Sequence, residues 1–284
     1  MDVRCNAARS IVHGVASTLM FLLFMTWAAA QSAKLRNLDL CNGMDRTIAD
    51  PQIIGCTALI ESGLEKSQTL VISYNNRGDA YSRKGEYELA IQDYDKSIKL
   101  NPNYAKAFNN RGVAYQNKGE YDRAIRDFDA AINITRDYAS AFANRGVTYE
   151  KKDDYSSASK DFDEAIRLQP TLKGVWNERC WARAIIGELQ AALADCNEAI
   201  RLEPNVAATF DSRGFTYLKL GQWELAIADY NSALRLNPKL ASALYGRGFA
   251  ELKMGDLVGG NADTAAAKTV EQNIVAEFAR HGLK

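Results

Sequence analysis

The sequence predicts an all-α protein: a right-handed α-solenoid of antiparallel helix pairs with a 34-residue period. The first observation is an arginine that recurs at an unbroken interval of 34 residues, at positions 77, 111, 145, 179, 213 and 247. The second is an aspartate sixteen residues after each of these arginines. In a solenoid each repeat buries its apolar face against its neighbours, so the fold presents a long surface for holding another molecule rather than a single catalytic cleft.

The predicted core follows the same period. We place the arginine at position 7, so that six repeats begin at residues 71, 105, 139, 173, 207 and 241 and the array spans residues 71–260. Glycine and alanine dominate positions 8 and 20, and aromatic residues dominate positions 4 and 24. Small residues let two helices approach closely while bulky ones fill the remaining gap. We therefore expect all four positions to lie in the core.

Each repeat is predicted to contain two short amphipathic helices. Position 15 is mostly glycine, which suits a helix end that needs a positive φ, at residues 85, 119, 187, 221 and 255. Position 32 is mostly proline, which stops the second helix, at residues 102, 170, 204 and 238.

This pattern resembles the tetratricopeptide repeat (TPR) family, and the segment NNRGDAYSRKGEYELAIQDYDKSIKLNP at 75–102 is close to a consensus repeat. The resemblance covers about 200 of 284 residues. Arg136 replaces the proline of its repeat, Asp153 replaces a glycine, and the sixth repeat loses its last aromatic residue and its proline. We interpret the sixth repeat as a capping unit and expect one continuous helix from about Asn261 to Arg280, within a cap over residues 261–284.

The N-terminal residues predict export. Arg4 and Arg9 precede an uncharged run over 11–30 that closes on three alanines. This arrangement is typical of a signal peptide, here residues 1–30. A permanent anchor is the alternative, but the densely apolar part over 19–27 is short for a membrane span of about 20 residues. We expect a periplasmic or secreted protein that begins near Gln31, with no stable membrane span after cleavage.

Cysteine usage agrees with export. Cys180 and Cys196 stand at positions 8 and 24 of one repeat, equally far from the turn near Glu188, so they are expected at the same level of the helix pair. Cys41 and Cys56 straddle a predicted turn in the same way, which indicates a degenerate, disulfide-stapled repeat within residues 31–70. With Cys5 in the predicted signal peptide, four cysteines remain; they allow three pairings, and the sequence alone leaves all three open.

Other functions find little support. The predicted mature chain has 33 basic and 34 acidic residues, with no basic run for nucleic acid. It has one histidine, His281, and no Walker-type loop, HExxH or Cys-x-x-Cys motif, so we expect no enzyme, no metal and no cofactor. The arginines and aspartates of the repeat are equidistant from the turn, which indicates structural ion pairs; anion binding is the alternative.

The resemblance implies that the first helix of each repeat lines a groove in which a protein or peptide binds. Positions 2, 5, 9 and 12 share one stripe of that helix. The stripe is polar or small in the early repeats and apolar in the late ones. Trp181, Phe215 and Phe249 share position 9 and are expected to form an aromatic strip. The candidate partner-binding residues are Asn75, Asn109, Asn177, Trp181, Phe215, Leu218, Tyr245, Phe249 and Leu252.

Three alternatives remain at this stage. The C-terminal helix could cover the aromatic strip through Ile274, Val275 and Phe278. The strip could instead hold an apolar small molecule, or the chain could associate with itself. The carboxylate clamp by which some TPR domains hold chaperone C-termini is not met, because Asp79 and Val113 stand where it needs asparagine.

Overall fold

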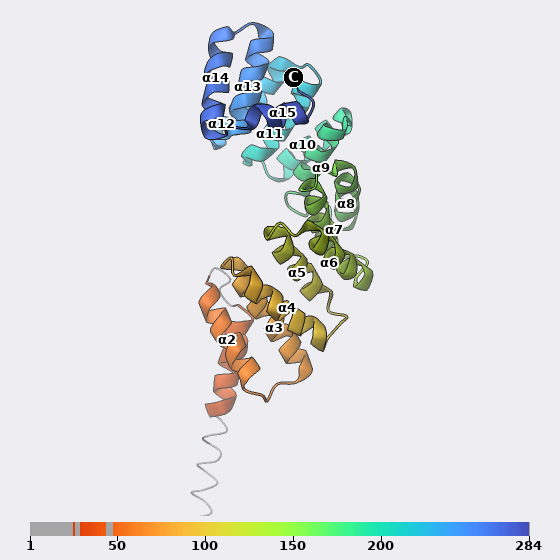
Figure 1. Ribbon diagram of the computed structural model, residues 1–284, viewed down its shortest axis with the longest axis vertical. Helices are drawn as coiled ribbons and strands as arrows, with labels where there is room; N and C mark the ends of the chain where they lie inside the picture. The colour runs from red at the N-terminus through yellow and green to blue at the C-terminus, as the bar shows by residue number, and fades with distance from the viewer. Residues whose placement is uncertain (1–24, 26–28, 44–47, 284) are drawn as a thin grey trace, which may run out of the picture. The chain divides into compact units, whose positions relative to one another are not determined.

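The computed structural model describes residues 25, 29–43 and 48–283, and those residues form helices and turns without a strand (Figure 1). The chain divides into two compact parts, one ending at Lys118 and one beginning at Gly119, which are described separately. The predicted signal peptide lies almost wholly outside the described residues. Within the described part of the chain, every helix is too short or too polar to span a membrane.

In the N-terminal part, a helix over residues 29–41 is followed by four helices. These are α2 (Ala49–Glu61), α3 (Ser67–Arg83), α4 (Tyr87–Leu100) and α5 (Ala105–Asn117). A disulfide joins Cys41, at the end of the first helix, to Cys56 of α2. The two helices are therefore stapled together, as the cysteine spacing predicts.

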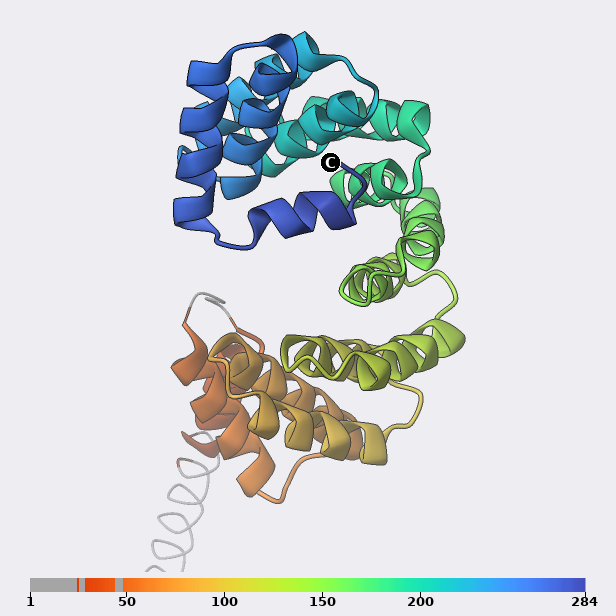
Figure 2. The same ribbon diagram turned by 45° about the horizontal axis from the view of Figure 1, so that its top comes forward.

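The C-terminal part contains ten helices among its described residues (Figure 2). They are α6 (Tyr121–Ile134), α7 (Ala139–Glu150), α8 (Tyr155–Leu168), α9 (Val175–Ile186), α10 (Leu189–Leu202), α11 (Ala207–Lys219), α12 (Trp223–Leu236), α13 (Ala241–Met254), α14 (Leu257–Val270) and α15 (Ile274–Arg280). Helices α7 to α14 form four pairs of a first and a second helix, and the neighbouring first helices α7, α9, α11 and α13 contact one another.

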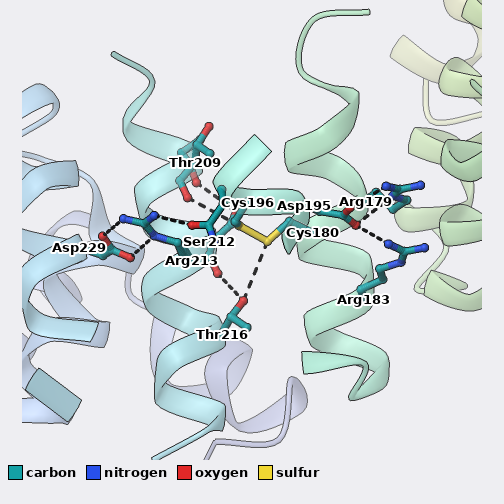
Figure 3. Close-up of a disulfide and its surroundings, with 12 residues drawn as sticks. Arg179, Cys180, Arg183, Asp195, Cys196, Thr209, Ser212, Arg213, Thr216 and Asp229 are labelled. Carbon is teal, nitrogen blue, oxygen red and sulfur yellow. Dashed lines mark hydrogen bonds and ion pairs between the residues drawn. A yellow bond between two sulfur atoms is a disulfide. The ribbon is translucent and has the colours of Figure 1, made fainter. Parts of the chain in front are cut away.

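Each helix pair is held together by a small residue on the first helix that packs against an aromatic residue on the second. A Cβ atom added to Gly146 of α7 would lie 2.6 Å from the ring of Phe162 on α8, so no larger residue fits. In the next pair, Cys180 and Cys196 take the same two places and form a disulfide (Figure 3). Position 24 is fully buried wherever it carries an aromatic residue, whereas the aromatic residues at position 4 are only partly buried.

The turn between paired helices needs a left-handed residue, as position 15 predicts. The glycines of five repeats have φ between 72° and 91° at this position. Asp153 takes the same conformation with φ 59°, the only residue other than glycine with a positive φ among the described residues. The turn geometry is therefore conserved within the chain even where the glycine is lost.

The predicted arginine ladder is confirmed as a set of ion pairs. Arg145 donates through Nε and Nη2 to Asp161, sixteen residues later, at 2.8 and 2.7 Å, and through Nη1 to Asp129, sixteen residues earlier. Arg179 binds Asp195 and Asp163 in the same manner. Each of these arginines thus ties its own helix pair to the preceding second helix, which is a structural role.

The predicted continuous C-terminal helix is wrong. Helix α14 ends at Val270, and Glu271 adopts an extended conformation with φ −138° and ψ 106°. The equivalent residues of earlier repeats, such as Asn101 and Asn237, end their helices with nearly the same angles. The repeat geometry therefore breaks the helix even without proline. The break lets α15 fold back and bury Ile274 and Phe278.

Candidate functional site

The first helices of the C-terminal part carry a cluster of rings that we call the aromatic face: Trp181 on α9, Phe215 on α11, and Tyr245 and Phe249 on α13. The ring centroids of Trp181 and Phe215 are 4.8 Å apart and their planes are tilted by 49°, so these two position-9 residues are in contact. Phe249 contacts Tyr245, at 6.5 Å, and Trp223 of α12, at 6.4 Å. The face is thus continuous over two helices and extends onto the third.

Helix α15 covers the centre of the aromatic face. Figure 2 shows its dark blue ribbon turning back from the end of α14. The ring of Phe278 lies 4.6 Å from Tyr245 and 5.7 Å from Phe215. As a result Phe215 is only 1% exposed, and Leu218 is equally buried. The aromatic strip is therefore not open: of the two alternatives, the structure shows the one in which the C-terminal helix covers it. Ile274 and Phe278 point inward, while Val275 is 39% exposed.

His281 follows α15 and fills a box of three rings. Tyr155 at the start of α8, Trp181 and Phe215 all meet its imidazole edge-on, with centroids 6.0, 5.3 and 6.3 Å away. The Tyr155 hydroxyl lies 3.3 Å from Nε2 of His281. Lys219 donates to the main-chain carbonyl of His281 at 3.3 Å. Burial lowers the pKa of His281, so the box favours a neutral ring.

Acidic groups lie beside this contact. Asp211 of α11 accepts a hydrogen bond from the Ser242 hydroxyl at 2.7 Å. Burial raises the pKa of Asp211 to about 7, and the nearby Glu277 of α15 raises it further. Burial also raises the pKa of Glu277. Helix α15 therefore brings a partly buried acid towards a buried one, an unfavourable arrangement when both carboxyls are ionised.

A second acidic pair lies between α7 and α9. The carboxyls of Glu150 and Glu178 are close enough for each to shift the pKa of the other. Burial raises the pKa of Glu150 to about 9, with Glu178 adding to the effect, and burial raises the pKa of Glu178 as well. Two carboxyls in contact away from water cannot both ionise easily, so the pair holds one proton at neutral pH.

The polar stripe of the N-terminal part differs from the predicted one by one residue. Asn75 and Asn109 are buried, because the first helices pack against each other over position 5. Asn110 Nδ2 donates to Asn75 Oδ1 at 3.2 Å, which links α5 to α3. The accessible amides are those of position 6. They line a cavity of about 520 Å³ formed by Asn42, Gln52, Ile72, Asn76, Asp79, Tyr104, Lys106 and Asn110.

The remaining predicted residues also lie away from an open groove. Asn177 is partly buried beside a cavity of about 330 Å³ at the start of α9, whose lining includes Trp176 and Leu202. Leu252 packs against Gly260 of α14, inside its own helix pair.

Sequence reasoning missed Tyr155, Lys219 and the ring of His281. One signal was available: Phe278, His281 and Gly282 stand 34 residues after Leu244, Arg247 and Gly248, as the start of a further first helix would.

The described residues hold no group of three or more histidine, cysteine, aspartate or glutamate side chains placed to bind a metal ion. The site instead offers an apolar helix face bordered by carboxyls. Such a face is chemically suited to holding another helix.

Comparison with known proteins identifies the family of these repeats. Residues 78–119 and 214–255 match the TPR repeat, and residues 105–138 and 139–172 match the tetratricopeptide repeat. Comparison with curated proteins found no match. The chain is a tetratricopeptide repeat protein, as its sequence pattern predicts.

Solved structures agree on the fold. YrrB, described as a TPR protein with an unusual peptide-binding site, is 24% identical with a TM-score of 0.57, over 68% of this chain and 97% of YrrB. A TPR protein from Parabacteroides merdae is 16% identical with a TM-score of 0.64, over 88% of this chain and 99% of that one. Pseudomonas aeruginosa pilF is 17% identical with a TM-score of 0.64, over 76% of this chain and 99% of its own. These identities establish a shared fold only.

Proposed function

We propose that this protein is an exported, non-enzymatic scaffold that binds a segment of another protein on the exposed side of its first helices. The observation that carries the proposal is the aromatic face, where Trp181, Phe215 and Tyr245 bury the rings of Phe278 and His281. This surface of the C-terminal part already accommodates a helix. TPR proteins in general bind protein segments in this manner, and YrrB is described as having a peptide-binding site.

The N-terminal part offers a polar surface, rather than an apolar one, to a segment of another protein. Asn76 and Asn110 present amides to a polar cavity, and Asp79 and Lys106 add a charge of each sign. Side-chain amides can hydrogen-bond the main chain of an extended segment without selecting its sequence. We therefore assign backbone recognition to this part and apolar anchoring to the aromatic face.

Export rests on the sequence of residues 1–30 and on the two disulfides, which are typical of proteins that fold in an oxidising compartment. The small-molecule alternative has a narrower basis. The cavity of about 330 Å³ beside Trp176 is lined by Leu202 and Val206 and could hold an apolar ligand. Extraction of the purified protein with organic solvent, followed by mass spectrometry, would reveal such a ligand.

Site-specific photo-crosslinking tests the scaffold function. A photoreactive residue is placed at Lys106 or Lys253, which are exposed on first helices, and at Lys160 or Arg235, which are exposed on second helices as controls. We expect one protein from the native host to crosslink from the two first-helix positions and not from the controls. A partner that crosslinks only from Lys160 or Arg235 would assign binding to the second helices and contradict the proposal.

A further inference from the structure

Helix α15 is short and is held on the aromatic face by few residues. It has seven residues, fewer than two turns, whereas isolated helices shorter than about 12 residues are marginal in water. A three-residue connection, 271–273, joins it to α14, which already completes the sixth repeat. Its inward contacts are made mainly by Ile274 and Phe278, together with His281 beyond its end.

The fit of α15 on its surface is incomplete. Oδ1 of Asp211 on α11 is buried and has no hydrogen-bond partner in the structure, and Nδ1 of the enclosed His281 is in the same state. Glu277 adds a negative charge near Asp211. The two carboxyls repel each other when both are ionised. Buried polar atoms in native proteins are almost always paired. The surface therefore offers an acceptor, Oδ1 of Asp211, that α15 does not use, and α15 brings a side chain of the same charge towards it.

We propose that α15 is an intramolecular occupant of a helix-binding site, and that the true partner is an amphipathic helix of another protein that displaces it. That helix carries an aromatic residue in the place of Phe278, a ring three residues later in the place of His281, and a basic residue in the place of Glu277. The basic residue pairs with Asp211. The inference rests on the proposed scaffold function and adds the chemistry of the partner and a means of keeping the site closed.

A foreign helix suits the site better than a second copy of this chain. The α15 of another copy would make the same contacts as the resident one and would lack its high effective concentration. A partner helix of three or more turns buries more apolar area, and its basic residue gains a charge-assisted hydrogen bond that α15 cannot make.

The test uses the full chain and three synthetic peptides that carry fluorescent labels. The first peptide has the sequence of residues 271–283, the second carries Glu277→Lys, and the third carries Phe278→Ser. They are titrated against wild type, against Phe278→Ser, which loosens α15, and against Val275→Ser, a matched control because Val275 is exposed on the same helix. Circular dichroism confirms that each variant is folded.

We expect the Phe278→Ser protein to bind the Glu277→Lys peptide at least about tenfold more tightly than the native peptide, and the Phe278→Ser peptide not at all. Wild type and Val275→Ser should bind the same peptides at least about tenfold more weakly, because α15 occupies the site. Equal binding by all three proteins would show that α15 does not close the site. Failure of the folded Phe278→Ser protein to bind any peptide would show that the face does not receive a separate helix.

Hydrogen exchange on wild type provides an independent measurement if Phe278→Ser fails to fold. Excess Glu277→Lys peptide should speed amide exchange in residues 276–281 and leave α14 unchanged. Unchanged protection of those residues at saturating peptide would overturn the proposal. A dimeric mass of wild type in light scattering that Phe278→Ser makes monomeric would also overturn it, because the occupant would then be a second copy. Neither result would affect the crosslinking test of the scaffold function.

Discussion

Tyr245 of α13 and Phe278 of α15 lie with ring centroids 4.6 Å apart at an interplanar angle of 65°. This contact joins α13, the first helix of the sixth repeat, to α15, which follows the repeat array. It also completes the enclosure of Phe215, which would otherwise stand open on α11. The surface that a partner meets is therefore set by the position of α15 as well as by the repeats.

Loss of one ladder arginine should destabilise the protein. Arg145→Ala leaves the buried Asp161 and its neighbour Asp129 without their shared cation, and breaking such a pair costs about 3 kcal/mol. Urea unfolding should show this loss. Arg167→Ala is the control, because Arg167 pairs with Glu164 in an exposed position and should cost less than about 1 kcal/mol. Equal stability of the two variants, with weakened partner binding by Arg145→Ala, would favour anion recognition.

The disulfide between α9 and α10 should be replaceable by the pair that other repeats use. Cys180→Gly/Cys196→Phe recreates the arrangement of Gly146 and Phe162 and should fold. Wild type should lose about 3 kcal/mol when this disulfide is reduced, because the unfolded chain then regains the freedom that closing a loop between residues 16 apart removes. The variant should lose less on addition of reductant, since only Cys41–Cys56 remains.

The single substitution Cys180→Gly is the control for that exchange. It removes the disulfide without supplying a ring, so a gap remains beside the buried Cys196, and we expect a stability at least about 1 kcal/mol below that of the double variant. Thermal denaturation under reducing conditions compares the two. A double variant no more stable than the single one would show that this pair of helices cannot accept an aromatic residue.

Restoring glycine at the one turn that lacks it should stabilise the protein. Asp153→Gly removes the strain of a side chain at φ 59° and should raise stability by about 0.5–1 kcal/mol. The lost contact from the Tyr155 hydroxyl, at 3.2 Å, is exposed and weak. Asp154→Ala is the contrast: Asp154 accepts from the Ser157 amide at 3.1 Å as the cap of α8, so its loss should cost about 1 kcal/mol.

The acid pair between α7 and α9 should make stability fall as pH rises. The folded-state pKa of Glu150, about 9, lies above its ordinary value, so its contribution is fully present below about pH 4.5 and is lost as pH rises towards 9. Glu150→Gln should remove much of this dependence and should be more stable than wild type at pH 8 by about 1–2 kcal/mol.

Thermal denaturation at pH 5 and pH 8 measures that difference. Glu224→Gln on the surface of α12 is the control for loss of a charge and should follow wild type at both values. A Glu150→Gln variant whose stability still falls between pH 5 and pH 8 as steeply as wild type would show that the pair does not share a proton.

Several features could be predicted from the sequence because they depend on contacts between neighbours in a periodic chain. Gly146 and Phe162 meet because both are equidistant from one turn, and the same rule pairs Cys180 with Cys196 and Arg145 with Asp161. The rule needs only the period and the geometry of two antiparallel helices. The candidate site was harder, because exposure of Phe215 depends on residues outside the repeat.

The sequence by itself determined the repeat, the paired helices, the turns, a cysteine placement that allows both local disulfides, and the presence of an aromatic cluster on α9, α11 and α13. Only the tertiary structure decided that Asn76 rather than Asn75 faces the polar cavity, that Glu150 meets Glu178, and that α15 leaves α14 to cover Phe215. Periodicity specifies which residues face a neighbouring helix. It does not specify where a non-repeating segment docks, because that depends on the shape that several packed helices leave between them.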